Sequence, residues 1–368
     1  MPSLFDPLAI KHMSLSNRIM RSATWDATAD AAGAVTENSV RLYRELAGGD
    51  IGLIVTGYAF VSHPLGQANP GQYGIYGDML IPGWKRLVQA VHAAGQSKIV
   101  MQIVHAGINS GYLVQRGQTL LAVSKLPEMT RPHREMTDEE IEGIIDDFAA
   151  AAVRVRAAGF DGVQLHGAHG YLMSQFASPL YNRRTDRWGG SAENRRRFHL
   201  EVVRRIRKAV GNDYPLLIKF GVMDDRPGGL TLAEGLEACR EMVAAGVDSI
   251  EVSSGVGSAA AAIKEGESDR PAHRERAIAV KKAVNVAVAV VSGIRSLVTA
   301  EEIIQSGDAD MVSMCRPFIR EPHLVSRWLR KDKRPAVCIS CNKCFPIVAR
   351  GEPLECGEER RLREGVRK

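Results

Sequence analysis

The chain has 368 residues, of which 45% are hydrophobic and 24% charged, and its formal net charge is +6. No apolar run approaches the roughly 18 residues that a membrane span needs, so we expect no membrane segment or membrane partner. The first residues lack a basic region followed by an apolar stretch, so we expect a cytoplasmic location. The arginines are spread through helical segments, and we expect no nucleic-acid partner.

After an irregular lead-in over residues 1–16, short apolar segments alternate with helical segments along the chain. Eight of these segments are rich in Val, Ile or Leu, which is typical of strands that are buried on both faces. The alternation predicts an α/β fold, namely a closed (β/α)8 TIM barrel. The predicted strands are Arg18–Ala23, Ile51–Gly57, Lys98–Val104, Gly162–Leu165, Leu216–Phe220, Ser249–Val252, Ala287–Val291 and Asp310–Ser313.

The helical segments have recognisable starts and ends. Thr137 with Glu140 and Thr231 with Glu234 have the spacing of a capping box, in which each residue hydrogen-bonds the backbone of the other. Glycines follow the helical runs, where a left-handed C-cap is expected. These glycines are Gly95, Gly159, Gly211, Gly246 and Gly307.

Two connections are longer than a barrel requires, Ile108–Met136 after the third strand and Ser174–Gly190 after the fourth. Both should lie on the carboxyl-end face, where barrel enzymes hold their active sites, so both are candidate lids. The alternative is structural packing over the barrel mouth, which we expect for most of Asn182–Gly190.

The fourth predicted strand runs directly into His166 and His169, followed by Tyr171. Neutral imidazoles can donate hydrogen bonds to a substrate carbonyl, and a phenol can release a proton late in a reaction. This group therefore predicts a site that polarises and protonates an organic substrate. The alternative is a pair of hydrogen-bonded structural histidines.

The ends of the seventh and eighth strands carry residues suited to a phosphate, Gly293 with Arg295 and Cys315 with Arg316. Glycine admits close backbone approach, and two arginines can bind a phosphate dianion. The segment Gly255–Ala260 also fits a loose dinucleotide pattern, but it follows the sixth strand, whereas that pattern belongs at the first strand of an open sheet.

Four of the six cysteines are close together near the end of the chain, at Cys338, Cys341, Cys344 and Cys356. Such spacing in a cytoplasmic chain indicates metal ligation rather than disulfides. The consecutive run of three cysteines, each separated from the next by two residues, favours a [4Fe–4S] cluster, and a four-cysteine zinc site is the alternative. We therefore expect a TIM barrel over residues 1–335 and a metal-binding extension over residues 336–368.

Three widely spaced motifs, Leu4–Leu8 with Asn17–Ile19, His166–Tyr171 and Phe176–Arg195, resemble signatures of the Old Yellow Enzyme family of FMN-dependent barrel oxidoreductases. The resemblance covers essentially residues 1–335. It implies that His166 and His169 bind the substrate and that Tyr171 donates a proton. It also implies contacts to FMN, with Gln102 at the pyrimidine ring, Ala23, Thr24 and Gly57 along the isoalloxazine, and Gly293, Arg295, Cys315 and Arg316 at the phosphate.

Three positions depart from the family pattern. Lys219 stands where many members have an arginine facing the flavin, so a cation is retained without its bidentate geometry. Trp25 stands where relatives often place a small polar or sulfur side chain, which alters the expected pocket shape and redox potential. Cys315 replaces a common glycine, and we expect a small buried filler rather than a reactive thiol.

The cysteine cluster is similar to that of the subgroup that resembles the N-terminal parts of 2,4-dienoyl-CoA reductase and trimethylamine dehydrogenase. In that subgroup the cluster is [4Fe–4S], and further nucleotide-binding domains usually follow it. Because the chain stops at Lys368, we expect the cluster to exchange electrons with a separate protein or to be structural.

The resemblance thus implies an FMN-dependent oxidoreductase that reduces an activated C=C bond of an enone, enoate or enoyl thioester with electrons from NAD(P)H or a protein donor. One alternative is an amine or N-methyl dehydrogenase that passes electrons from FMN through the cluster, with Trp25, Tyr58 and Tyr73 as aromatic walls for a cationic nitrogen. An RNA-modifying flavin barrel and a non-catalytic metal or flavin carrier are further alternatives. The sequence leaves the oligomeric state open, with a homo-oligomer as one alternative.

Overall fold

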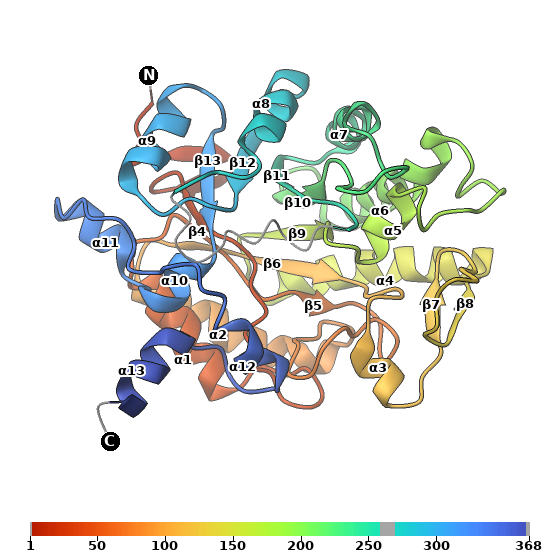
Figure 1. Ribbon diagram of the computed structural model, residues 1–368, viewed down its shortest axis with the longest axis horizontal. Helices are drawn as coiled ribbons and strands as arrows, with labels where there is room; N and C mark the ends of the chain where they lie inside the picture. The colour runs from red at the N-terminus through yellow and green to blue at the C-terminus, as the bar shows by residue number, and fades with distance from the viewer. Residues whose placement is uncertain (1, 258–268, 366–368) are drawn as a thin grey trace.

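The computed structural model describes residues 2–257 and 269–365, and its centre is a closed barrel of parallel strands (Figure 1). The strands follow one another in the order β4-β3-β13-β12-β11-β10-β9-β6, and a β4–β6 pairing closes the ring. The barrel strands are β3 (Ile19–Arg21), β4 (Leu53–Val55), β6 (Lys98–Val104), β9 (Gly162–Gly167), β10 (Leu216–Gly221), β11 (Ser249–Ser253), β12 (Ala287–Val291) and β13 (Met311–Met314). The predicted TIM barrel and its eight predicted strands are confirmed.

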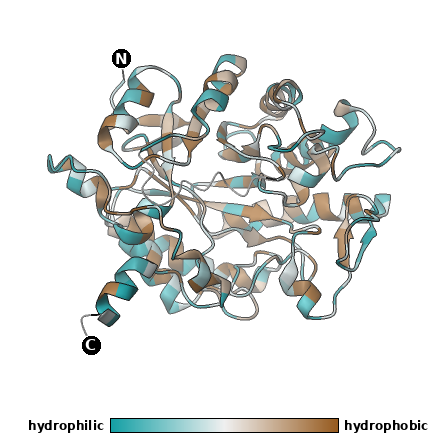
Figure 2. Ribbon diagram, viewed as in Figure 1, coloured by the Kyte–Doolittle hydropathy of each residue, from teal (hydrophilic) through white to brown (hydrophobic). Residues whose placement is uncertain are grey.

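Helices surround the barrel and bury their apolar faces against it. Figure 2 shows hydrophobic residues concentrated on the strands. A single large cluster of buried side chains joins strands and helices, as expected where strands are covered on both faces. The covering helices are α1 (Glu37–Ala47), α2 (Ile81–Ala94), α4 (Asp138–Ala157), α6 (Ala192–Val210), α7 (Leu232–Ala245), α8 (Arg274–Ala283), α9 (Leu297–Gln305) and α11 (Leu324–Leu329). In the part of the chain that the structure describes, no helix has both the length and the apolar character needed to cross a membrane.

Both predicted capping boxes are present, at Thr137 of α4 and at Thr231 of α7. Four of the five predicted C-cap glycines have positive φ angles, but Gly95 has φ 176°, which is extended backbone. A Cβ atom on Gly95 would lie 2.8 Å from the Ala47 carbonyl oxygen. Close approach to α1, rather than a left-handed cap, therefore requires glycine at this position.

The irregular lead-in predicted for residues 1–16 is wrong, because the segment contains an antiparallel hairpin of β1 (Leu8–Ile10) and β2 (Met13–Leu15). The hairpin packs against residues near the starts of the barrel strands, including Leu53 and Leu217, in a separate apolar cluster. It therefore fills the amino-terminal end of the barrel. Strands of three residues are too short to produce a recognisable alternation in sequence.

The connection Ile108–Met136 is a small folded unit rather than an open loop. It contains α3 (Gly111–Gln115) and the paired strands β7 (Leu120–Ala122) and β8 (His133–Glu135), and it has its own apolar cluster. By contrast, the connection after β9 begins in α5 (Leu172–Ala177) and then packs tightly.

Asn182, in the second connection, donates hydrogen bonds to the carbonyl oxygens of Phe176 and Trp188. Arg184 is buried and donates to the carbonyl oxygens of Val123 and Met136. These contacts support the structural role that we expected for Asn182–Gly190.

The chain beyond the eighth strand returns across the carboxyl-end face of the barrel. It contains α10 (Arg316–Arg320), α12 (Phe345–Ala349) and α13 (Gly357–Gly365). Ala336 N donates to the Arg295 carbonyl oxygen at 2.7 Å, and Leu354 N donates to the Asp26 carbonyl oxygen at 2.8 Å. The cysteine-rich segment, residues 336–365, is therefore held against loops that follow β12 and β3.

Candidate active site

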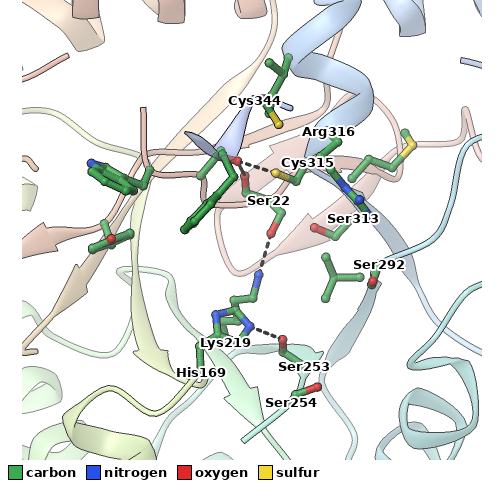
Figure 3. Close-up of a pocket in the computed structure, with 18 of the residues that line it drawn as sticks. Ser22, His169, Lys219, Ser253, Ser254, Ser292, Ser313, Cys315, Arg316 and Cys344 are labelled. Atoms are coloured by element: carbon green, nitrogen blue, oxygen red, sulfur yellow. Dashed lines mark hydrogen bonds between the residues drawn. The ribbon is translucent and has the colours of Figure 1, made fainter. Parts of the chain in front are cut away.

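A cavity of about 590 Å³ lies at the carboxyl ends of the barrel strands. Figure 3 shows Lys219 and His169 entering it from one side and Cys315, Arg316 and Cys344 from the other. No Asp or Glu is among the described residues that line it. The structure brings together in this lining most of the predicted site residues, namely Ala23, Thr24, Gln102, His166, His169, Tyr171, Lys219, Gly293, Arg295, Cys315 and Arg316.

Gly57 does not line the cavity. Its backbone N–H donates to the Tyr43 hydroxyl at 2.6 Å, and a Cβ atom on it would lie 2.9 Å from the Thr24 carbonyl oxygen. Gly57 thus lets the loop after β3 approach β4 closely. Its direct contact to a flavin remains a prediction.

The two predicted substrate-binding histidines lie next to each other at the end of β9. Their ring centroids are 5.1 Å apart and the rings are perpendicular. His169 adopts φ 60°, and its Nε2 shares a hydrogen bond of 2.8 Å with Ser253 Oγ. The left-handed backbone at His169 turns its ring toward β11, which places both imidazoles on one wall of the cavity.

Both imidazoles are uncharged near neutral pH. Burial lowers the pKa of His166 well below its usual range, and the nearby His169 and Lys219 lower it further. Burial also lowers the pKa of His169 to about 3, with Lys219 and His273 adding to the effect. A neutral imidazole retains one N–H group, so each can donate a hydrogen bond without bringing a positive charge into the cavity.

Tyr171 is the N-cap residue of α5, and its ring centroid lies 4.8 Å from that of His166. Its hydroxyl donates to the Tyr58 hydroxyl at 3.3 Å, and Asn69 Nδ2 donates to the same Tyr58 oxygen at 2.5 Å. Burial raises the pKa of Tyr171, so the phenol keeps its proton. Sequence reasoning missed Asn69, because nothing in a loop asparagine marks it as a partner of a distant tyrosine.

Lys219 of β10 is a buried cation in the cavity lining, with an exposed fraction of 4%. Its Nζ donates to Ser22 Oγ at 2.7 Å and forms an ion pair with Glu251 Oε1 at 3.2 Å. Glu251 is also buried and accepts a hydrogen bond from Ser313 Oγ. Sequence reasoning missed Glu251, although a lone carboxylate inside an apolar strand is a usable signal, since such a charge requires a partner.

Gln102 belongs to the same buried network. Its Nε2 donates to Gln164 Oε1 at 2.8 Å, and Gln164 Nε2 donates to Glu251 Oε2 at 3.1 Å. These bonds fix the orientation of the Gln102 amide. Residues of three strands, β6, β9 and β11, thus hold it at the cavity wall. The arrangement is pre-organised for hydrogen bonding to a planar ligand.

The ends of β12 and β13 present the two predicted phosphate-binding arginines. Arg316 Nη1 donates to Asn342 Oδ1 at 2.6 Å and to the Ser340 carbonyl oxygen at 3.3 Å. Arg295 Nη2 donates to the Ala336 carbonyl oxygen at 3.4 Å, while Arg295 Nε is buried without a partner among the described residues. Both guanidinium groups therefore donate to oxygen atoms of the cysteine-rich segment, two of them backbone carbonyls and one the side chain of Asn342.

Cys315 is half-buried and lines the cavity, so the expectation of a buried filler is wrong. Its sulfur lies 3.0 Å from Thr24 Oγ1, because the end of β13 is next to the loop after β3 in the closed ring. Trp25 and Tyr58 also line the cavity, but Tyr73 is buried in the core and does not.

The four clustered cysteines are free of disulfides, with Cys338 buried and Cys341, Cys344 and Cys356 half-buried. Burial raises the pKa of Cys338 and raises that of Cys344 to about 11, so these thiols are protonated without a metal. Cys344 also lines the cavity. Within residues 2–257 and 269–365, no three His, Cys, Asp or Glu side chains are arranged to hold a metal ion.

The loose dinucleotide motif is only partly described, because its last three positions, 258–260, lie outside the described residues. A Cβ atom on Gly255 would lie 2.1 Å from Asp224 Oδ1, which also accepts a hydrogen bond from Val256 N. The first glycine therefore has a packing role against Asp224.

Comparison with known proteins identifies one matching family model, described as the NADH:flavin oxidoreductase / NADH oxidase family, over residues 3–334. The chain is 39% identical over 350 residues to an NADH oxidase of Thermoanaerobacter brockii, covering 93% of this chain and 53% of the relative. It is 35% identical to an NADPH dehydrogenase of Geobacillus sp. (strain WCH70), covering 87% of this chain and 92% of the relative.

Among solved structures, a 2-naphthoyl-CoA reductase in complex with 2-naphthoyl-CoA superposes with a TM-score of 0.90 at 30% identity. The match covers 96% of this chain and 56% of that protein. The chain thus spans about half the length of the NADH oxidase and of the reductase, and most of the NADPH dehydrogenase.

Proposed function

Because the chain belongs to the NADH:flavin oxidoreductase / NADH oxidase family, as its motifs predict, we propose that it is an FMN-dependent oxidoreductase of the Old Yellow Enzyme type. Its proposed reaction is reduction of an activated C=C bond in an unsaturated carbonyl compound. NAD(P)H or a protein donor supplies the electrons. The grouping of two neutral imidazoles and a protonated phenol in one cavity carries this proposal.

In this proposal the N–H groups of His166 and His169 hold the substrate carbonyl oxygen. Hydrogen bonds to that oxygen strengthen as negative charge develops on it, which lowers the barrier to attack at the β-carbon. Tyr171, whose phenol keeps its proton, then protonates the α-carbon. Tyr58 and Asn69 orient the Tyr171 hydroxyl, because they form the hydrogen-bonded chain that ends on it.

The cavity contains groups that fit FMN. The buried Arg295 Nε without a partner among the described residues and the cationic Arg316 suit the phosphate, while Gly293, at φ 80°, admits close backbone approach. Lys219 and Gln102 would meet the pyrimidine edge of the ring system, where a cation favours an anionic reduced ring. Bound FMN would supply the hydride chemistry.

The proposal extends to a [4Fe–4S] cluster on Cys338, Cys341, Cys344 and Cys356, with zinc as the alternative metal. Four free thiols with this spacing, three of them half-buried, support it. Ser340 and Asn342, between these cysteines, have φ angles of 59° and 58°. Such left-handed residues let the backbone between the cysteines turn tightly.

The lining of the cavity argues against oxidation of a cationic amine. Trp25 and Tyr58 could serve as aromatic walls, but the described lining contains four Lys or Arg residues and no carboxylate. Lys219 is paired with Glu251, which lies outside the lining, and no carboxylate in the described lining is placed to attract a positively charged substrate. An unsaturated carbonyl compound fits this electrostatic environment better.

An anaerobic experiment separates these possibilities. Purified protein loaded with FMN is photoreduced and mixed with 2-cyclohexenone, and in parallel the oxidised protein is mixed with trimethylamine. We expect the enone to restore flavin absorbance and the amine to cause no bleaching; the reverse pattern would reject the reductase. Analysis of the same preparation for iron, zinc and acid-labile sulfide identifies the metal bound by the four cysteines. About four irons per chain are expected for [4Fe–4S].

A further inference from the structure

The cavity has more positive charge than the proposed reaction accounts for. Four cationic side chains line it, Arg131, Lys219, Arg295 and Arg316. Lys219 is paired with Glu251, and Arg295 and Arg316 are held at the ends of β12 and β13. Arg131 has no role in the phosphate site or in the histidine and tyrosine group.

Arg131 also differs from the other cations of its folded unit. Arg134 forms a bidentate pair with Glu140, and Arg116 donates to the Tyr112 hydroxyl. The Arg131 guanidinium, in contrast, has no hydrogen-bond or ion-pair partner among residues 2–257 and 269–365. Arg131 is exposed like Arg116, but it also lines the cavity, so its solvated donors are available to a ligand that enters there.

The backbone that carries Arg131 is fixed. The buried His133 hydrogen-bonds the Arg131 carbonyl oxygen through Nδ1 at 2.7 Å, and its Nε2 accepts from Leu126 N at 3.0 Å. One imidazole thus ties two parts of the connection between β7 and β8 together. An arginine on a pinned backbone loses less freedom on binding a ligand than one on a free loop.

Arg131 lines the same cavity as the reacting groups, and other residues of its folded unit contact the wall that holds those groups. Asn109, from the same connection after β6, lines the cavity and donates through Nδ2 to the His169 carbonyl oxygen at 3.3 Å. Ser110 Oγ donates to the Ala68 carbonyl oxygen, one residue before Asn69. The folded unit therefore contacts both the histidine wall and the loop that supports Tyr58 and Tyr171.

We propose that Arg131 is a specificity-determining residue that binds an anionic group, a carboxylate or phosphate, on a ligand whose carbonyl or nicotinamide end reaches the flavin. This inference rests on the proposed function, because it assumes a ligand held between Arg131 and the histidines. The guanidinium fork matches the geometry of both oxyanions. The anion belongs either to the unsaturated substrate or to the nicotinamide donor.

Binding is measured first, because it does not require turnover. The FMN-loaded protein is titrated by calorimetry with acetophenone and with 4-acetylbenzoate, a matched neutral and anionic pair of ketones that contain no reducible alkene. We expect Arg131→Gln to weaken binding of 4-acetylbenzoate by about ten-fold, and that of acetophenone by less than about two-fold. Arg131→Lys should recover part of the loss, since it keeps the charge without the fork.

Arg116→Gln is the matched control, because Arg116 is exposed on the same folded unit and does not line the cavity. It should bind both ketones as the unmodified protein does. Anaerobic reduction of the flavin by NADH and by NADPH then tests the other source of the anion. If the donor supplies it, Arg131→Gln raises the donor concentration needed for half-maximal reduction and leaves the Kd of 4-acetylbenzoate unchanged.

Equal behaviour of Arg131→Gln and Arg116→Gln in both the titrations and the flavin reduction would overturn the assignment of Arg131. Reoxidation of the reduced flavin by benzylideneacetone and by its para-carboxylate tests the proposed function separately. If neither enone reoxidises the flavin in any of the proteins, the reductase proposal fails, while the titrations still decide whether Arg131 binds an anion.

Discussion

The Tyr171 hydroxyl donates its hydrogen bond to the Tyr58 hydroxyl at 3.3 Å, so the proposed proton donor is oriented by a residue from a different strand-end loop. Asn69 Nδ2 donates to the same Tyr58 oxygen. The proposed acid is therefore a phenol whose hydroxyl is oriented by two other side chains, Tyr58 directly and Asn69 through Tyr58.

Replacing Tyr171 with Phe removes the proton and keeps the ring. We expect reoxidation of the reduced flavin by 2-cyclohexenone to slow by about 100-fold, the lower end of what a positioned general acid contributes. Reduction of the flavin by NAD(P)H should change little, because no proton from Tyr171 enters that step. Stopped-flow absorbance of the two half-reactions measures both, and equal reoxidation rates in the two proteins would reject the role of Tyr171.

The buried pair of Lys219 and Glu251 should show strong coupling in stability. Each single variant, Lys219→Met or Glu251→Gln, leaves an unpaired or poorly satisfied group in the barrel and should lower the free energy of unfolding by about 3–5 kcal/mol. The double variant should lose less than the sum of the two. Urea unfolding of the four flavin-free proteins gives the free energies for a double-mutant cycle. If the losses of the two single variants add up to that of the double variant, the ion pair contributes no net interaction.

The arginine at the end of β13 should control retention of the flavin. Arg316→Gln removes one charge-assisted hydrogen bond to the expected phosphate, a loss of about 1.5–3 kcal/mol, or roughly ten- to hundred-fold in the Kd of FMN. Quenching of FMN fluorescence on titration with apoprotein measures this constant. Arg330→Gln, at an exposed position outside the cavity, is the control and should bind FMN normally; an unchanged Kd in Arg316→Gln would remove Arg316 from the site.

Stability should fall in mild acid because several histidines are buried without charge. For His199, on α6, burial lowers the pKa from 6.5 to about 4. Between these two pH values the unfolded chain binds a proton at His199 and the folded chain does not. The stabilisation is complete above pH 6.5 and is lost as pH falls toward about 4. His105, His166, His169 and His273 act in the same direction.

His199→Leu tests this effect outside the active site, because His199 packs against Phe198 and Phe220 and does not line the cavity. Between pH 6.5 and 4 the variant should lose stability less steeply than the unmodified protein, by about 1.4 kcal/mol per pH unit, the contribution of one proton. Urea midpoints across this range measure the slope. Parallel slopes would mean that His199 does not titrate on unfolding.

The sequence predicted the barrel well because each of its strands is a short apolar run between a helix and a loop, and those local signals agree with the closed sheet. It did not predict the hairpin of β1 and β2, whose strands are too short to alternate visibly. At the site, His166, His169 and Tyr171 were recognisable because they are neighbours in sequence. Glu251 was not, because the closed ring is what brings it to Lys219 on the neighbouring strand. Asn69 and Arg131 were not, because no motif marks a loop residue as part of the cavity wall.

Several hydrogen bonds cross the boundary that we predicted at residue 335, between the barrel and the cysteine-rich segment. Arg316 donates to the Asn342 and Ser340 oxygens, and Ala336 N donates to the Arg295 carbonyl oxygen. A displacement of the cysteine-rich segment would therefore move the guanidinium groups that face the expected phosphate. By thermodynamic reciprocity, whatever orders that segment should tighten FMN binding, and bound FMN should order the segment. The two cofactors would then load cooperatively, and a barrel truncated after residue 335 should retain flavin poorly.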